Sequence, residues 1–247
     1  VINGKLIDFN NHMKRLDRSM TELKFKKLLN HLDILIFHRK LIELNNLKEG
    51  MIYLQVTRGV ADRSFDMPKD KIEPTVLAFT QEKKIIDSES AKNGIKVMTL
   101  DDMRWKRCDI KTTQLLYASM AKTEATEKGF DDAWMLREGY VTEGSSSNAW
   151  IIKGKIIMTR QSDNLILSGI TRDAIFKCAK DLGYEVVTKN ITLQDAQSAS
   201  EAFITSATAC VMPVVKINAS QIGDGKPGKF VTALREEYIK QALESSI

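Results

Sequence analysis

The chain has 247 residues, of which 43% are hydrophobic and 28% are charged, a composition typical of globular proteins. With only 4 Pro and 13 Gly it is neither collagen-like nor low-complexity, and no apolar run approaches the ~20 residues that span a membrane. The formal net charge is +5, and the excess lies in residues 1–48, which hold ten Lys and Arg but five Asp and Glu.

The N-terminal third of the sequence predicts a small domain that mixes α and β structure. Asn3 and Gly4 form a turn signal between short apolar runs, and Met13, Leu16 and Met20 recur at helical spacing. Thr21 is the expected cap of a second helix. The expected elements are a hairpin over 1–9, helices over 11–20 and 21–47, and strands over 52–56 and 75–80.

Residues 82–93 are mostly polar and charged, and we expect them to link two domains, residues 1–81 and 94–247. The larger domain mixes short strands and helices without a regular βαβ alternation, which favours an α+β fold over a doubly wound parallel sheet. Gly129 and Gly183 are expected to end two of its helices. We expect strands over 95–100, 133–136, 149–152, 155–158 and 201–204, and helices over 114–128, 170–182 and 229–243.

The chain has three cysteines, Cys108, Cys178 and Cys210, a sparse odd set that favours reduced thiols and a cytoplasmic location. The cysteines and the three histidines have no zinc-like spacing, so we expect no metal site. Acidic residues are interspersed among the basic residues of the first 48, and no nucleic-acid-binding motif accompanies them. A solvated helix face or a small anion site is therefore favoured over a nucleic-acid surface.

Three segments are rich in small and hydroxyl residues: Val141–Asn148, Leu167–Arg172 and Thr205–Ala209. The second lies at the start of a predicted helix, where backbone N–H groups and the positive end of the helix dipole bind anions. Thr171 adds a hydroxyl there. Each segment alone is more often a cap or a turn, but together they predict a phosphate cradle.

Four ordered motifs carry a more specific signal. They are Asp109–Lys111, Val141–Asn148, Gly169–Arg172 and Ile222–Gly228. Their order and spacing resemble the fold-type IV aminotransferases that use pyridoxal 5'-phosphate (PLP), which include branched-chain and D-amino-acid aminotransferases. The D-amino-acid (D-alanine) branch is the most similar. The resemblance implies a two-domain α+β fold in which the small N-terminal α/β domain is truncated, because the family has a further segment before the position of Val1.

The resemblance implies that Lys111 is the catalytic lysine, which forms a Schiff base with PLP. A lysine amine suits this role because it attacks the aldehyde of PLP and, once freed, can move a proton. Glu143 is implied to face the pyridine nitrogen, where a carboxylate keeps that nitrogen protonated. Without the flanking motifs, Lys111 would be read as a surface lysine and Glu143 as a turn residue.

The remaining cofactor contacts are also implied by the resemblance. Arg15 matches the family's phosphate-binding arginine, a residue type whose guanidinium can form paired hydrogen bonds to phosphate oxygens. Leu167 is implied to pack under the ring. The other implied contacts to the phosphate are Ile170, Thr171, Ser206 and Ala207, the last at a position where relatives often have threonine.

Substrate binding is implied to use Arg63, which matches an arginine that binds the substrate carboxylate in the D-amino-acid branch. That branch usually has histidine two residues later, where this chain has Phe65. In the family, groups from one subunit reach the site of the other, so the resemblance also implies a homodimer. It implies no nucleic-acid or membrane partner.

The expected reaction is transamination between a small D-amino acid such as D-alanine and a 2-oxo acid such as 2-oxoglutarate. Phe65 leaves a branched-chain L-amino-acid aminotransferase as an alternative. A second alternative is a PLP-dependent lyase of the aminodeoxychorismate lyase type. A third, from a different class, is a non-catalytic binding protein that uses the basic N-terminal face.

Overall fold

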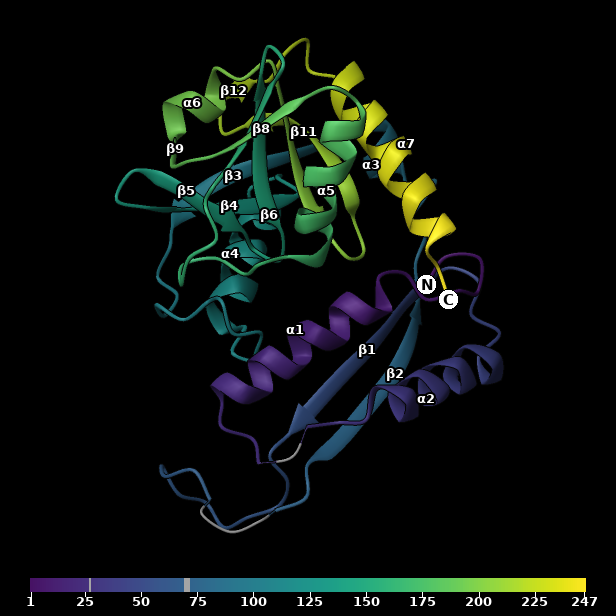
Figure 1. Ribbon diagram of the computed structural model, residues 1–247. Coiled ribbons are helices and arrows are strands. Elements are labelled where there is room, and N and C mark those ends of the chain that lie inside the picture. The colour runs from purple at the N-terminus through teal and green to yellow at the C-terminus, as the bar shows by residue number, and fades with distance from the viewer. Residues whose placement is uncertain (27, 69–71) are drawn as a thin grey trace. The chain divides into compact units, whose positions relative to one another are not determined.

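The computed structural model describes residues 1–26, 28–68 and 72–247, and it divides into two compact units (Figure 1). Unit 1 comprises residues 1–85 and 245–247, and unit 2 comprises residues 86–244. The division falls inside the segment expected as a linker, of which Glu89–Asn93 form the short helix α3. Each unit has a hydrophobic core of its own.

The described part of unit 1 contains two helices and a two-stranded antiparallel sheet. Phe9 and Met13, one turn apart on the first helix, are buried together with Leu6 and Ile34. Ile52, on the first strand, packs against this cluster. The elements are α1 (Phe9–Glu22), α2 (His31–Leu44), β1 (Gly50–Thr57) and β2 (Thr75–Glu82). Helix α1 therefore buries Met13 and Met20, two of the three residues whose helical spacing predicted it.

Both ends of the chain lie in unit 1 and are held by backbone hydrogen bonds (Figure 1). Ile2 and Lys5 exchange two N–H···O bonds of 3.0 Å around Asn3 and Gly4, whose φ angles are 52° and 73°. Positive φ at both central residues is the conformation that Asn-Gly favours. The predicted turn is therefore confirmed. Ile247 exchanges two further backbone bonds, of 2.8 and 3.1 Å, with Leu6.

The predicted helix over 21–47 is wrong in its first third. Helix α1 continues past Thr21, which therefore lies inside a helix instead of capping one. Helix α2 begins only at His31, because the side chain of Asn30 accepts two backbone N–H groups of its first turn at 2.8 and 3.4 Å. Asparagine is among the strongest N-cap residues. Residue 27 of the predicted helix lies outside the described residues.

Unit 2 is built on a ten-stranded mixed sheet, counted over the described residues. The strand order is β8-β7-β6-β10-β11-β3-β4-β5-β9, and β12 pairs with β11. The pairs β11–β3, β3–β4 and β7–β8 are parallel and the other pairs are antiparallel. The strands are β3 (Ile95–Asp101), β4 (Asp132–Arg137), β5 (Tyr140–Gly144), β6 (Asn148–Lys153), β7 (Ile156–Thr159), β8 (Glu185–Thr188), β9 (Ile191–Thr192), β10 (Glu201–Ser206), β11 (Cys210–Ile217) and β12 (Ser220–Gln221).

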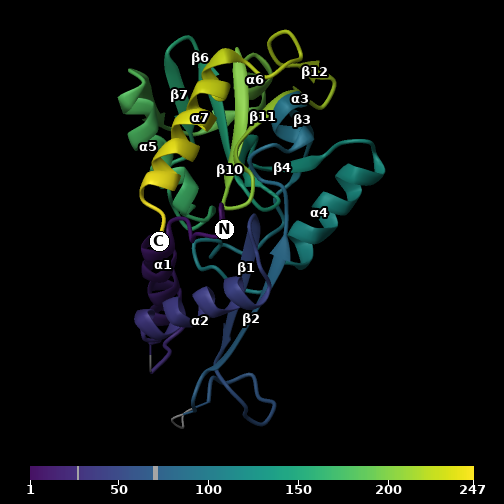
Figure 2. The same cartoon turned by 90° about the vertical axis from the view of Figure 1, so that its right-hand side faces the viewer.

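Helices cover both sides of this sheet (Figure 2). Helices α5 and α7 pack against each other and against β10, whereas α4 packs on β3 and β4. The helices of unit 2 are α3, α4 (Leu116–Glu127), α5 (Ile170–Asp181), α6 (Leu193–Gln197) and α7 (Lys229–Glu244). Trp150 and Phe203 stack in the core with ring centroids 5.3 Å apart and no exposed surface. Each such side chain contributes about 1.5–3 kcal/mol to the stability of unit 2.

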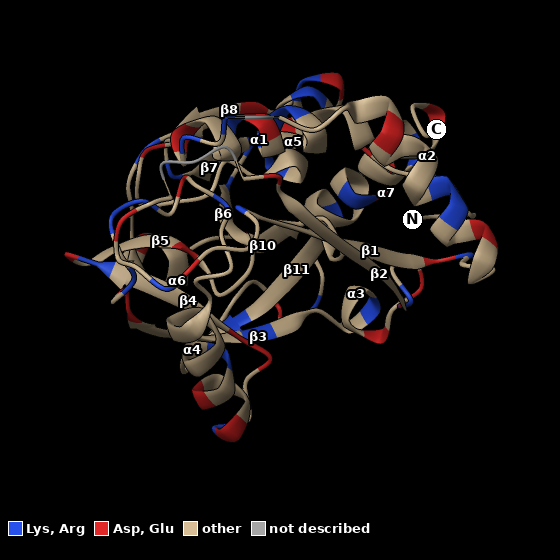
Figure 3. Ribbon diagram, turned by 90° about the horizontal axis from the view of Figure 1, so that it is seen from below, with Lys and Arg blue, Asp and Glu red and all other residues tan. Residues whose placement is uncertain are grey.

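Charged residues of both signs occur along the helices (Figure 3). In the sequence of α1, for example, Asp17 lies among Lys14, Arg15 and Arg18. This mixture agrees with a solvated helix face. Within the described ranges, no helix is both long and apolar enough to cross a bilayer.

Candidate active site

Lys111 lies in the loop between β3 and α4, where buried neighbours fix the backbone. The preceding residue, Ile110, is 5% exposed, and the carboxylate of Asp109 is also buried. Arg107 donates from Nε and Nη2 to the two oxygens of Asp109, at 3.0 and 3.2 Å. Lys111 itself is exposed. The loop therefore anchors its backbone through Asp109 and Ile110 and leaves Lys111 exposed.

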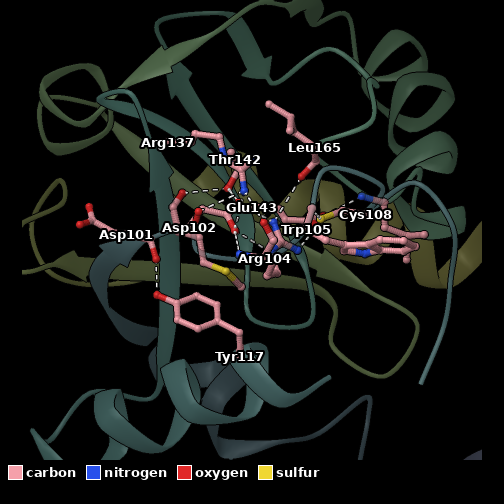
Figure 4. A network of polar contacts seen from close by, with 12 residues as sticks. Asp101, Asp102, Arg104, Trp105, Cys108, Tyr117, Arg137, Thr142, Glu143 and Leu165 are labelled. Carbon is pink, nitrogen blue, oxygen red and sulfur yellow. Dashed lines mark hydrogen bonds and ion pairs between the residues drawn. The ribbon is translucent and has the colours of Figure 1, made fainter. Parts of the chain in front are cut away.

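Glu143 lies near the end of β5 and is buried, with 5% of its surface exposed. Its Oε1 accepts a hydrogen bond of 2.5 Å from Arg104 Nη1. Its Oε2 accepts from Asn148 Nδ2 at 3.0 Å and from the backbone N–H of Leu167 at 3.1 Å. Figure 4 shows Glu143 beside Arg104. Three segments distant in sequence therefore converge on one carboxylate.

Burial raises the pKa of Glu143 to about 7, although the positive charge and the hydrogen bond of Arg104 act in the opposite direction. A carboxylate out of water is costly unless donors compensate it. The three donors around Glu143 supply that compensation. This side chain therefore changes its charge near neutral pH, which is unusual for glutamate.

Asn148, at the start of β6, joins Glu143 to the beginning of α5. Its Nδ2 donates to the backbone oxygen of Leu167 at 2.8 Å as well as to Glu143. A Cβ at Gly169 would collide with Asn148 Oδ1, so only glycine fits at this position. Helix α5 begins directly after Gly169, which makes no side-chain capping bond.

The first turn of α5 has the properties of an anion-binding site. Gly169 has no side chain that could accept the first N–H groups, and Ile170 and Thr171 are both buried. Uncapped N–H groups at a helix start bind phosphate or carboxylate oxygens. The predicted phosphate contacts of Ile170 and Thr171 therefore lie where the backbone can make them.

Ser206 is the last residue of β10, which pairs with β6 in the antiparallel direction. Thr205, its neighbour, pairs with Asn148, the residue that bonds to Glu143 and Leu167. The Ser206 hydroxyl accepts the N–H of Ala209 at 3.1 Å, which closes the turn to β11. Ala207 is exposed in that turn. The sheet therefore brings the end of β10 next to the strand that holds Asn148.

Two predicted site residues, Arg15 and Arg63, belong to unit 1. Arg15 lies on α1, where its Nη2 is 3.4 Å from His12 Nδ1. Arg63 lies in the segment between β1 and β2 and stacks on Phe65, with its guanidinium carbon 5.0 Å from the ring centre. The structure thus brings together Glu143, Leu167 and the start of α5 within unit 2, whereas the two arginines are part of unit 1.

Three residues around Glu143 were not identified as site residues from the sequence. Asp102 and Arg104 follow strand β3 in a segment of closely spaced charges that ends at Lys111, and Asn148 ends the motif that begins at Val141. Charges that alternate directly after a buried strand indicate a polar site at its end, and this signal could have identified Arg104. No sequence pattern indicates that Asn148 bonds to Leu167.

The sequence is similar to known proteins along its whole length. The family model described as "Amino-transferase class IV" matches residues 1–217. The D-alanine aminotransferase of Staphylococcus aureus (strain N315) is 37% identical over 249 residues, an alignment that covers 100% of this chain and 87% of that protein. These matches confirm the resemblance that the four motifs indicated.

The fold is shared with solved structures. The branched-chain amino acid aminotransferase of Escherichia coli superposes with a TM-score of 0.87 at 23% identity, over 96% of this chain and 80% of the other. That of Thermobaculum terrenum, in its PLP-bound holo form, gives 0.85 at 20% identity, over 97% and 80%. The expected α+β, fold-type IV architecture is confirmed. This chain belongs to the amino-transferase class IV family.

Proposed function

We propose that this protein is a PLP-dependent aminotransferase that moves the amino group of a small D-amino acid, such as D-alanine, to a 2-oxo acid such as 2-oxoglutarate. The observation that carries the proposal is the buried carboxylate of Glu143, held by three donors beside an uncapped helix start. The relatives that are 36–37% identical along the whole chain are named D-alanine aminotransferases, which supports the substrate class.

The residues present fit PLP at both of its ends. The uncapped start of α5 offers backbone N–H groups to the phosphate. The ring nitrogen would be held by Glu143 and one ring face by Leu167. The remaining phosphate contacts in this proposal are Arg15, Ile170, Thr171, Ser206 and Ala207.

Bound PLP supplies an electron sink for the pair left behind when the substrate Cα loses its proton. Lys111 would hold the cofactor through its Nζ, and its free amine would accept the proton that leaves the substrate Cα and return it at C4′. The carboxylate of Glu143 would accept a hydrogen bond from the protonated pyridine nitrogen. Arg63 would orient the substrate by binding its carboxylate.

The main alternative to this proposal concerns whether the substrate is a D- or an L-amino acid. Phe65 occupies the position where the D-amino-acid branch has histidine, and its ring covers the guanidinium of Arg63. A branched-chain L-amino-acid aminotransferase is therefore the second candidate, and the solved structures that share this fold include such enzymes. A lyase of the aminodeoxychorismate type is the third.

Rates with D-alanine and with L-leucine, each with 2-oxoglutarate, distinguish the two aminotransferases. We expect D-alanine to be the better donor. A higher rate with L-leucine would select the branched-chain alternative, and release of pyruvate from added aminodeoxychorismate, with no 2-oxo acid present, would select the lyase. Lys111→Ala should abolish turnover, whereas Lys153→Ala, a control at the end of β6, should not. Wild-type rates in Lys111→Ala would refute the assignment of this lysine.

We also propose a homodimer in the cytoplasm. Several apolar side chains of the β3–α4 segment are exposed, and a second copy would cover them. They are Met103, Trp105, Leu115, Leu116 and Met120. None of the three cysteines, all of which lie in the described ranges, forms a disulfide, which is typical of proteins in a reducing compartment. Sedimentation equilibrium measures the mass in solution, and a monomer at micromolar concentration would contradict the proposed dimer.

Arg15 tests the proposed phosphate site independently of turnover. Arg15→Ala should weaken PLP binding about tenfold or more, because a guanidinium–phosphate pair contributes roughly 1.5–3 kcal/mol. Titration of the cofactor-free protein with PLP, followed by absorbance, gives the affinity. Lys14→Ala, one position away on α1, is the matched control. Equal affinities in both variants would remove Arg15 from the site.

A further inference from the structure

A chain of charged side chains connects the end of β3 to Glu143. Arg104 donates from Nε and Nη2 to the two oxygens of Asp102, at 2.9 and 2.8 Å, and from Nη1 to Glu143 Oε1. The guanidinium therefore bridges two carboxylates (Figure 4). The arginine side chain is 14% exposed, and the side chains of Asp102 and Glu143 are 0% and 6% exposed. All three charges are thus largely removed from water.

Asp102 is held rigidly in this arrangement. Thr142, the neighbour of Glu143 on β5, donates its hydroxyl to Asp102 Oδ2 at 2.8 Å. Arg137 donates to the backbone oxygens of Asp102 and Arg104 at 3.0 and 2.8 Å. The planar guanidinium of Arg104 has little rotational freedom once it makes two parallel hydrogen bonds to Asp102. Its third nitrogen is therefore fixed against Glu143.

The acceptor positions of Glu143 are nearly all used. An ionised carboxylate offers about four lone-pair positions. Among the described residues, Oε2 accepts two hydrogen bonds and Oε1 accepts one. One position is left, and it is on the oxygen that Arg104 contacts. A fourth donor, such as a protonated ring nitrogen, would complete the set.

We infer that Arg104 is a positioning residue for the cofactor: anchored on Asp102, it holds Glu143 in its ionised form and leaves one oxygen lone pair of Glu143 for the pyridine nitrogen. This inference rests on the proposed function, because it concerns the carboxylate proposed to face the ring. It adds a residue that does not itself touch the cofactor. Arg104 affects cofactor binding only because it keeps Glu143 negatively charged.

The electrostatics of the site support this role. Burial alone would leave Glu143 neutral, since it raises the pKa to about 7 even with Arg104 present. Asp102 acts in the same direction as burial, whereas Arg172 is a second cation that interacts with Glu143. Burial opposes the charge of Arg104, but the hydrogen bonds and charges of Asp102 and Glu143 outweigh it and raise its pKa. Arg104 therefore stays charged throughout the working range of pH.

The direct test is the titration of Glu143 in the cofactor-free full chain. Carbon-13 NMR of protein labelled at the glutamate side-chain carboxyl follows this group, and the peak missing from Glu143→Gln identifies it. Arg104→Met removes the cation, so the midpoint should rise by roughly 1–3 pH units, the effect expected of one close opposite charge. Arg104→Gln is a second neutral variant in case the first does not fold. Arg104→Lys should recover part of the shift.

Lys153→Met is the matched control, because it removes a cation from another ion pair of unit 2, that with Asp195. Its Glu143 midpoint should equal that of the wild type. A midpoint in Arg104→Met or Arg104→Gln within ~0.3 pH units of the wild type would overturn the inference, since a purely structural role of Arg104 moves the unfolding midpoint but not this titration.

PLP affinity provides a second readout. At pH 8, a rise of about 2 pH units in the Glu143 midpoint should weaken PLP binding by Arg104→Met about tenfold, because the ionised fraction of Glu143 then falls from about nine-tenths to about one-tenth. In the Glu143→Gln background the same substitution should have less than about a threefold effect, because no charge remains to be held. Equal losses in both backgrounds would overturn the inference. If the wild type itself bound no PLP, the proposed function would fail while the Glu143 titration still decided the role of Arg104.

Discussion

Two of the carboxylate–cation pairs of unit 2 have similar N···O distances, but the pKa of the carboxyl group is shifted in opposite directions. Lys153 Nζ lies 2.8 Å from Asp195 Oδ1, and Arg104 Nη1 lies 2.5 Å from Glu143 Oε1. The pKa of Asp195 is lowered to about 2, chiefly by its hydrogen bonds with Lys153 and Thr192. That of Glu143 is raised to about 7, because burial outweighs its partner.

The difference between the pairs shows what each is suited to do. The side chain of Asp195 is 33% exposed and closes a capping box at the start of α6, so water and a helix stabilise its charge. Glu143 has no such solvation, and a buried ion pair is weak evidence for stability. The first pair suits a structural role, and the second suits a group whose charge is needed by a ligand.

The largest expected effect is on the transamination rate, which should depend on Glu143 but not on Asp195. Glu143→Gln should lower the transamination rate by about 10²-fold or more, because a neutral amide cannot hold a protonated ring nitrogen. Asp195→Asn should keep a rate within about twofold of the wild type while it loses roughly 1–2 kcal/mol of unfolding free energy, from a weakened cap and ion pair. Steady-state rates and urea unfolding measure both. Equal losses of activity in Glu143→Gln and Asp195→Asn would contradict the different roles assigned to the two carboxylates.

Stability as a function of pH should have opposite signs at the two sites. For Glu143, whose pKa is raised in the folded cofactor-free chain, the contribution to the free energy of unfolding is full below the unfolded pKa near 4.5 and is lost as pH rises through about 7. Relative to Glu143→Gln, the wild type should therefore lose about 2.5 kcal/mol between pH 5 and pH 8. Urea unfolding at both pH values tests this, and a parallel pH dependence in the two proteins would contradict it.

For Asp195 the sign reverses, because its pKa is lowered on folding. The stability that its charge contributes is present above the unfolded pKa of about 4 and is lost as pH falls toward about 2. The difference in unfolding midpoint between the wild type and Asp195→Asn should therefore be constant from pH 6 to pH 8 and shrink below pH 4. Thermal unfolding across this range measures it. A difference that instead changed between pH 6 and pH 8 would show that another group is responsible.

The smallest expected effect concerns a buried titratable group that has no counter-charge. His38 is 5% exposed, neither ring nitrogen has a hydrogen-bond partner among the described residues, and burial lowers its pKa. Only the unfolded chain then takes up a proton near pH 6.5, so stability falls as the pH drops below that value. His38→Phe should remove this fall and shift the midpoint at pH 5.5 upward relative to the wild type. An unchanged pH profile in the variant would contradict the assignment.

The sequence identified the family but not the residues that surround Glu143. The order and spacing of the motifs around Lys111, Glu143 and Gly169 resemble those of the family, which the family model confirms, whereas the hydroxyl and glycine residues at a helix start predicted only an anion site. Arg104 and Asn148 were not found, since their partners are 39 and 19 residues away and are brought near only by the sheet.

The same reason explains two missed strands, whereas the wrong start of the helix expected over 21–47 was a local error, the unrecognised cap of Asn30. Strands β5 and β11 were not predicted: β5 was read as a glycine and hydroxyl motif, and β11 is an almost continuous apolar run that contains Pro213. Buried strands without alternation give little periodic signal. By contrast, Gly129 and Gly183 follow α4 and α5 with φ angles of 78° and 75°, as their helix-ending role requires. Local geometry was readable from the sequence, whereas long-range pairing was not.

The most direct test of this account is the position of the cofactor on the chain. Borohydride reduction of the PLP-loaded protein fixes the cofactor to the amine that carries it, and mass spectrometry of the peptides then locates it. The account predicts a single phosphopyridoxyl group on the peptide that contains Lys111. The same group on another lysine, or on none, would contradict it.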